Sequence, residues 1–173
     1  YDTILDDLQT IYGEKAVPVQ YPLATGPGFN SLIDVILMKK LTWKEEGGAP
    51  VIEEIPAEEM ERATMLHKAL VEAAAENDEQ LMEKFFETEQ LTEDEMREGI
   101  RKGMVTRSIF PVFCVCAAKD MGVGRLMEFL GNVVPYVDEM PVVYNSRGEA
   151  VAPVEDGPTS IYFFKTGVEP HIG

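Results

Sequence analysis

The sequence predicts an α/β fold, and three stretches of the chain carry this prediction. Residues 108–116 are almost entirely apolar, as expected for a strand of a parallel sheet that is covered on both faces. A short loop and an amphipathic stretch that stops at Pro135 follow this strand. Residues 17–43 are β-rich, and residues 56–103 have helical periodicity. A strand–loop–helix unit usually holds ligands in its loop, here residues 116–120.

The amino-terminal elements follow from local patterns. A helix is expected over residues 1–13, because Ile4, Leu8 and Ile11 fall on one side and Gly13 suits a helix end. The elements expected after it are a strand over 17–23, a turn at 25–28, two β-rich segments within 31–43 and a loop at 47–50.

Three helices are expected in the middle of the chain. Pro56 suits the first turn of the first helix. The buried stripe expected for this helix comprises Met60, Ala63, His67, Leu70 and Ala74. Asn77 followed by Gln80 caps the second helix, which carries Leu81, Met82, Phe85 and Phe86. Residues 92–95 form a capping box that opens the third helix, which we expect to end at Gly103.

The carboxyl-terminal third is expected to begin with a helix after the 116–120 loop. Its core-facing stripe is predicted to be Val123, Leu126, Met127, Leu130 and Val134. Four prolines then interrupt residues 135–158, which are expected to form a linker or a hairpin with its turn at 145–148. A strand is expected over residues 159–168.

Composition restricts the classes of partner. The chain has 173 residues, and its 31 acidic against 15 basic side chains give a net charge of −16. This charge repels phosphate backbones, so we expect no direct nucleic-acid binding and favour a basic protein partner. No run of 18 apolar residues is present, so no membrane span is expected. The ends of the sequence suggest an excised fragment.

The two cysteines are expected to be reduced thiols in the core of a cytoplasmic protein. Cys114 and Cys116 are separated by one residue, so a disulfide between them would be strained. A metal site would need two more ligands, and both histidines, His67 and His171, lie far away in sequence. We therefore predict no metal site.

The sequence contains no recognisable catalytic constellation. The phosphate-binding motif G-x-x-x-x-G-K-[ST] is absent, as are Asn-Lys-x-Asp and Asp-x-x-Gly. Gly122-x-Gly124 lacks a third glycine, and tight packing at a helix start explains it equally well. His67 lies on an apolar stripe and fits a hydrogen-bonded core residue, and Ser108 fits a polar residue at a strand edge. No catalytic residue is therefore predicted.

The residues VFCVCAAKDMGVGRLMEFLGNVVPYVDEMP resemble the end of the GTPase domain of elongation factor G, the ribosomal translocation factor. Further segments that resemble the family follow in order along the chain: PVQYPLATGPGFNSLIDVILMKK, EIPAEEM, LVEAAAENDEQLMEKFFETEQLTEDEM and IYFFKTGVEPHIG. The resemblance implies a partial GTPase-domain sheet and helix, an inserted α/β subdomain and the first strand of a β-barrel domain. The remnant of the GTPase domain corresponds to residues 1–24 and 107–134, and the inserted subdomain to residues 25–106. A linker or hairpin corresponds to 135–158, and the start of the β-barrel domain to 159–173.

The resemblance also implies two sets of functional residues. Cys116, Ala117 and Ala118 occupy the loop whose backbone contacts the guanine base, with main-chain donors expected at Cys116 and Ala117. Glu72, Glu76 and Glu79 match acidic positions that face the mobile stalk protein of the large ribosomal subunit. GTP and Mg²⁺ are implied for the parent protein, whereas the fragment alone is expected to hold no cofactor and to be inactive.

Alternatives remain open at this point. The chain could be a stand-alone acidic protein-interaction module that shares ancestry with the insert. The parent could be a diverged paralogue with altered GTPase activity, because Cys116 and Ala118 depart from the family's usual Ser and Phe. Other ribosomal GTPases of the superfamily are a weaker alternative. The strand over 159–168 is expected to pair with the preceding hairpin or with a neighbouring molecule.

Overall fold

The computed structural model of the protein describes residues 1–157, 159–161, 163 and 165–167. It divides into two units, Tyr1–Pro135 and Tyr136–Gly173. The boundary lies where the linker was expected to begin. The assignment of these ranges to domains of a larger protein remains a prediction.

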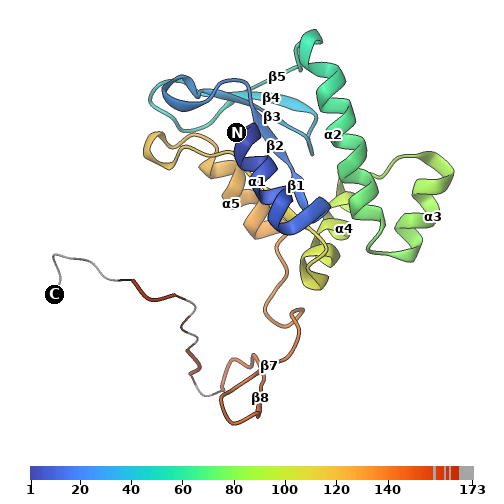
Figure 1. The fold of residues 1–173 in the computed structure, drawn as a ribbon, viewed down its shortest axis with the longest axis vertical. Helices are drawn as coiled ribbons and strands as arrows, with labels where there is room; N and C mark the ends of the chain where they lie inside the picture. The colour runs from blue at the N-terminus through green and yellow to red at the C-terminus, as the bar shows by residue number, and fades with distance from the viewer. Residues whose placement is uncertain (158, 162, 164, 168–173) are drawn as a thin grey trace. The chain divides into compact units, whose positions relative to one another are not determined.

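The first unit has a mixed α/β fold, as the sequence predicted (Figure 1). Its α-helices are α1 Asp2–Tyr12, α2 Ala57–Ala75, α3 Glu79–Thr88, α4 Glu93–Thr106 and α5 Val123–Asn132. Its strands are β1 Ala16–Pro18, β2 Gln20–Pro22, β3 Ser31–Asp34, β4 Lys39–Thr42, β5 Val51–Glu53 and β6 Phe110–Val112. Short 3-10 helices are η1 Gly13–Lys15, η2 Gly26–Gly28 and η3 Ala117–Lys119. No described helix is both long enough and apolar enough to span a membrane.

Two sheets meet at a single residue, Val19. Strands β1 and β6 pair in parallel, and β2, β3, β4 and β5 form an antiparallel sheet in that order. The Val19 amide donates to the Val112 carbonyl at 3.1 Å, and the Val19 carbonyl accepts from the Val35 amide at 3.0 Å. The strand expected over 17–23 is therefore present, but it passes from one sheet to the other.

The antiparallel sheet has two covered faces. Tyr21 and Ile33 are paired across β2 and β3 and belong to the main core, together with the buried side of α2. Leu32 and Leu41 are paired across β3 and β4 and belong to a second cluster that includes Met121. This alternation follows from the period of two in a strand, which sends successive side chains to opposite faces. The antiparallel sheet is therefore a layer between the helices and the loop after β6.

Helix α2 buries most, but not all, of the predicted stripe. Ala63, Leu70 and Ala74 are buried, whereas Met60 is exposed, which corrects the prediction. The stripe shifts toward Val71 and Ala75 because α4 crosses close to this end of α2. A Cβ atom at Gly99 of α4 would lie 2.8 Å from the Ala74 carbonyl carbon, so the two helices are in contact through backbone atoms.

The helix caps confirm one prediction and correct two. Thr92 and Glu95 form the predicted capping box at the start of α4. Helix α3 is capped by Asp78 rather than Asn77, since the Asp78 carboxylate accepts from the amides of Gln80 and Leu81. Helix α4 continues past Gly103 to Thr106, with Arg107 in a left-handed conformation at its end. A Cβ atom at Gly103 would lie 2.7 Å from Ile109 Cδ1, so Gly103 leaves room for the Ile109 side chain.

The last strand and helix differ most from the sequence prediction. Only Phe110–Val112 is in strand β6, and Phe110 is exposed, so the prediction of a strand covered on both faces over 108–116 is wrong. In α5 the buried side chains are Arg125 and Phe129, while Met127 and Leu130 of the predicted stripe are 59% and 45% exposed. The buried face of α5 contacts the antiparallel sheet through a charged residue, Arg125, which an apolar pattern cannot reveal.

The second unit contains a hairpin. Strands β7 Val143–Tyr144 and β8 Ala150–Val151 are antiparallel, and the expected turn at 145–148 joins them. None of the described residues within 159–168 belongs to a strand, so the expected strand and its pairing with the hairpin are not found there. Residues 162, 164 and 168 of that prediction lie outside the described residues.

Candidate functional site

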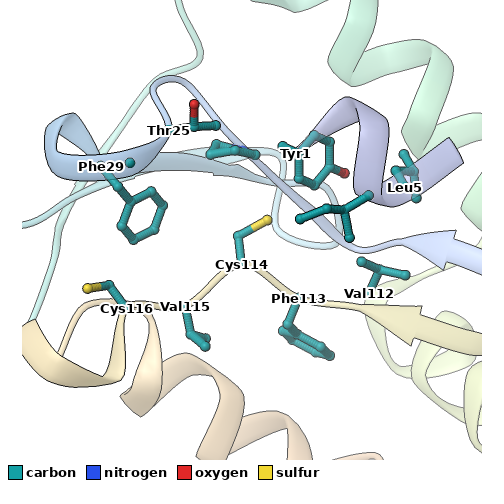
Figure 2. Close-up of a pocket in the computed structure, with 12 residues that line it drawn as sticks. Tyr1, Leu5, Thr25, Phe29, Val112, Phe113, Cys114, Val115 and Cys116 are labelled. Carbon is teal, nitrogen blue, oxygen red and sulfur yellow. The ribbon is translucent and has the colours of Figure 1, made fainter. Parts of the chain in front are cut away.

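The loop after β6 is the candidate ligand-binding element. Figure 2 shows Cys114 pointing to the side of Tyr1 and Phe29, and Phe113 and Val115 pointing the opposite way. The Phe113 ring meets the Phe129 ring of α5 edge-on at 4.7 Å between centroids. The segment thus keeps the alternation of a strand beyond the last paired residue, and it places residues 116–120 at the carboxyl end of a parallel strand. Ligand sites of α/β sheets form at this position.

A cavity of about 400 Å³ borders this loop (Figure 2). It lies between α1, the turn around η2 and residues 112–116, and Tyr1, Leu5, Phe29, Cys114 and Cys116 are part of its lining. The lining is mainly apolar, which suits a flat or apolar group better than a phosphate. Among the described residues, no three His, Cys, Asp or Glu side chains converge to hold a metal ion.

The main-chain amides of the loop are only partly free. The Cys116 amide donates to the Met121 carbonyl at 2.8 Å, and the Met121 amide donates back to Cys116 at 3.1 Å. Cys116 therefore has no free donor, contrary to expectation. Ala117 and Ala118 are exposed, and their amides have no hydrogen-bond partner among the described residues. These two amides are the donors that remain for a ligand oxygen.

Both cysteines near the loop are free thiols, as predicted, but they are half-buried at the edge of a core cluster and not inside it. The Cys114 thiol lies 3.6 Å from the Gln20 carbonyl oxygen, to which it donates. Burial raises the pKa of Cys114 to about 11, because a thiolate is poorly solvated there. Cys114 is thus a protonated packing residue near neutral pH.

A buried ion pair joins α5, the helix after the loop, to β3 of the antiparallel sheet. The Arg125 Nε atom donates to Asp34 Oδ2 at 2.8 Å, and the two side chains are 7% and 1% exposed. Gln20 Nε2 donates to the same oxygen at 3.1 Å. Burial by itself would lower the pKa of Arg125, but the carboxylates of Asp34 and Glu128 outweigh it and hold that pKa above its ordinary value.

Sequence reasoning missed this ion pair. The available signals were an arginine inside an otherwise apolar helical stretch and an aspartate at the end of the apolar run SLID. Neither signal names the partner, because Asp34 and Arg125 are 91 positions apart.

The predicted acidic residues lie together around one turn, away from the loop. Glu72 is exposed on α2, Glu76 follows the last residue of that helix, and Glu79 begins α3. Glu72 and Glu76 are one helical turn apart and therefore share a face. None of the three makes an ion pair with another described residue of the chain, so their charges are available to a partner.

The residues predicted to be non-catalytic have ordinary structural partners. His67 is half-buried, and its Nδ1 atom lies 2.7 Å from the Val35 carbonyl oxygen. Ser108 lies just before β6, where its hydroxyl donates to Asn77 and to the Gly103 carbonyl. A Cβ atom at Gly122 would lie 2.7 Å from the Cys114 carbonyl oxygen, so tight packing accounts for this glycine.

Comparison with known proteins gives a fold relationship. No protein-family model matches the chain. A crystal structure of a protein from Thermus thermophilus is similar, with a TM-score of 0.68 and 28% sequence identity over 78% of this chain. The chain spans about a fifth of the length of that protein, since the match covers 20% of it.

Proposed function

We propose that this chain is a section of a translational GTPase that resembles elongation factor G and promotes ribosomal translocation. In this proposal the loop 116–120 is one wall of the guanine site, and residues 25–106 are an inserted docking subdomain. The observation that carries the proposal is the pair of free, exposed amides at Ala117 and Ala118 at the carboxyl end of a parallel strand. Amides in this place can donate to a guanine oxygen without help from side chains.

Uncovered apolar surface on both sides of β6 supports the proposal. Helix α1 exposes Ile4 and Ile11, and helix α5 exposes Met127 and Leu130. Within the described residues, β6 pairs only with β1, so its other edge is open. An open parallel edge between two apolar helix faces fits the remaining strands and helices of a doubly wound GTPase sheet. That is the occupant we propose for this surface.

The acidic face around Glu72, Glu76 and Glu79 would meet the basic stalk protein of the large ribosomal subunit. Complementary charge mainly speeds the encounter of two proteins and adds less to their affinity. The net charge of −16 supports the same assignment, because it disfavours direct contact with ribosomal RNA.

Nucleotide binding tests the first part of the proposal. The full-length product of the gene should bind a fluorescently labelled GDP analogue with a micromolar or tighter Kd and should require Mg²⁺ for GTP binding. The 173-residue chain should give no saturable signal below millimolar nucleotide, because it lacks the phosphate-binding motif. A micromolar isotherm for the short chain, or no binding by the full-length protein, would contradict the proposal.

Charge reversal tests the docking surface. The double variant E72K/E76K should slow association of this chain with the purified stalk protein about tenfold at low salt, and added salt should remove the difference. The matched control is D6K/D7K, which changes net charge equally on exposed positions of α1. Equal association rates for the two variants would show that only net charge matters and would refute docking at Glu72 and Glu76.

A second candidate function is a stand-alone acidic interaction module. The acidic residues free of ion pairs at the α2–α3 turn favour it, since they require no nucleotide site. The two candidates differ in the GDP experiment, because an independent module predicts stalk binding without nucleotide binding by the gene product. A diverged paralogue with altered GTPase activity would bind GDP but hydrolyse GTP without stimulation by ribosomes.

A further inference from the structure

The turn between β4 and β5 lies against the candidate guanine-side loop. The Gly48 amide donates to the Asp120 carbonyl at 3.3 Å. The Trp43 indole nitrogen donates to the Gly48 carbonyl at 3.0 Å and fixes the turn to its own strand. Trp43 is itself buried in the cluster that contains Met121, the residue that directly follows the loop. The inserted sheet therefore contacts the loop through both backbone and side chains.

Gly47 is the closest point of this contact. A Cβ atom at Gly47 would overlap the Lys119 carbonyl oxygen and would lie 3.0 Å from the Lys119 carbonyl carbon. Both atoms belong to the backbone of the loop, so any side chain at Gly47 must displace the loop itself. Gly48 has nearly the same φ, +83° against +77° at Gly47, but a Cβ atom at Gly48 would meet nothing within 4 Å. The close approach of the loop therefore requires a glycine at position 47 and not at position 48.

We propose that Gly47 is a positioning residue for guanine recognition, through which the inserted subdomain holds the Ala117 and Ala118 amides in place. This inference rests on the function proposed above. The hydrogen bonds between Cys116 and Met121 close the loop. Displacement of the Lys119 backbone should therefore displace the neighbouring residues of the loop as well. Because Ala117 and Ala118 precede Lys119 directly in η3, displacement of Lys119 redirects both amides.

The same contact links the two proposed functions of the chain. The sheet that carries Gly47 is covered on its other face by α2, the helix that bears Glu72 and Glu76. The Asp34–Arg125 ion pair fixes the same sheet to α5, just after the loop. The insert thus contacts the loop at its carboxyl end, at Lys119 and Asp120, and contacts the following helix through Arg125.

The test compares G47A with G48A in the full-length gene product, with GDP and ADP as probes. Both substitutions place alanine at positive φ, so both share that backbone strain. G47A should weaken GDP binding about tenfold relative to G48A, the size expected for a lost hydrogen bond to the base. The GDP-to-ADP affinity ratio should fall by the same factor, because the contacts to phosphate are common to both nucleotides. A role in stability alone would leave this ratio unchanged.

Amide hydrogen exchange in the 173-residue chain provides a second measurement. The Lys119 and Asp120 amides are hydrogen-bonded within the loop at 3.1 and 3.2 Å, so they report its order. They should exchange about tenfold faster in G47A than in G48A, while buried core amides remain alike in the two variants.

The outcomes separate this inference from the proposed function. Equal GDP affinities and equal GDP-to-ADP ratios in the two variants would overturn the role of Gly47 while leaving the GTPase proposal intact. Absence of GDP binding in the unmodified full-length protein would overturn both. Equal exchange of Lys119 and Asp120 in the two short-chain variants would show that the turn does not hold the loop.

Discussion

Removing Arg125 should strongly destabilise the chain, because it leaves a buried carboxylate without its counter-charge. Asp34 Oδ1 accepts from the amides of Ile36 and Leu37, and Oδ2 accepts from Gln20 and Arg125. In R125M the three neutral donors remain, but the charge of Asp34 is no longer compensated. Breaking a buried pair by removing one partner costs about 3–5 kcal/mol. Burial of the two side chains, at 7% and 1% exposure, places this pair in that class.

The double variant D34N/R125M separates the charge from the shape of the site. Asparagine can still accept from Ile36 and Leu37, so the turn after β3 is kept while the uncompensated charge is removed. We expect the double variant to cost roughly 2 kcal/mol, about half of the loss in R125M, because no uncompensated charge stays buried in it. D34N alone should cost less than R125M, since Arg125 Nη1 keeps its ion pair with Glu128 at 2.9 Å.

Urea unfolding followed by tryptophan fluorescence measures these free energies. The single tryptophan, Trp43, lies in the cluster next to the loop and reports on the first unit. For a chain of this size, 3–5 kcal/mol corresponds to a fall in Tm of roughly 6–20 °C, which provides an independent check. A loss below about 1 kcal/mol in R125M would refute the argument, because the pair would then behave as an exposed one.

Three further predictions concern packing, reactivity and pH. G99A should destabilise the chain by about 1–3 kcal/mol, because the backbone of α2 contacts α4 at Gly99. G131A, with open space around Gly131, should be neutral or stabilise the chain by up to about 1 kcal/mol. Equal urea midpoints for the two variants would contradict this. Cys114, with a pKa of about 11, should react with iodoacetamide at pH 8 roughly a hundredfold more slowly than an unstructured cysteine, as followed by mass spectrometry; a rate within threefold of the unstructured one would contradict the burial of its thiol. Hydrogen bonds, first from Lys84 and then from Thr92, lower the pKa of Glu95 from 4.5 to about 2. The charged form of Glu95 therefore stabilises the fold above pH 4.5, and this contribution is lost as the pH falls toward 2. The Tm of the unmodified chain should exceed that of E95Q by less and less across this pH range, and a constant difference would exclude the effect.

Features with local causes could be predicted from the sequence. The capping box of Thr92 and Glu95 depends on four consecutive residues, and the hairpin turn at 145–148 depends on a similarly short segment. Both predictions are confirmed because the donors and acceptors involved are near neighbours in the chain. The cap of α3 was predicted one residue too early, at Asn77 instead of Asp78, since either side chain can accept hydrogen bonds from the first free amides of a helix.

Features that depend on pairing across the chain could not be predicted. The position of the candidate loop follows from its strand, but its support comes from Gly47 and Trp43, which lie far earlier in the chain. The predicted stripe of α5 was wrong at Met127 and Leu130 for the same reason. Periodicity identifies the largest apolar face of a helix, and it cannot tell which face the neighbouring elements cover. Here the covered face contains Arg125, whose burial depends on the Asp34 carboxylate in β3.

In helix α5, the local apolar pattern and the long-range pairing of Arg125 with Asp34 favour different faces of the helix. A helix that buries an arginine and exposes Met127 and Leu130 is unfavourable for an isolated body, because burying each apolar side chain would contribute about 1.5–3 kcal/mol. The arrangement becomes favourable when a second protein layer covers the apolar face, as the proposed GTPase sheet would. Arg125 then keeps the buried face of α5 on the antiparallel sheet, and the apolar face contacts the added layer. On this reasoning α5 couples the position of the antiparallel sheet to the loop that precedes the helix, since Arg125 fixes one face of the helix to β3 while Gly122 fixes its start beneath Cys114.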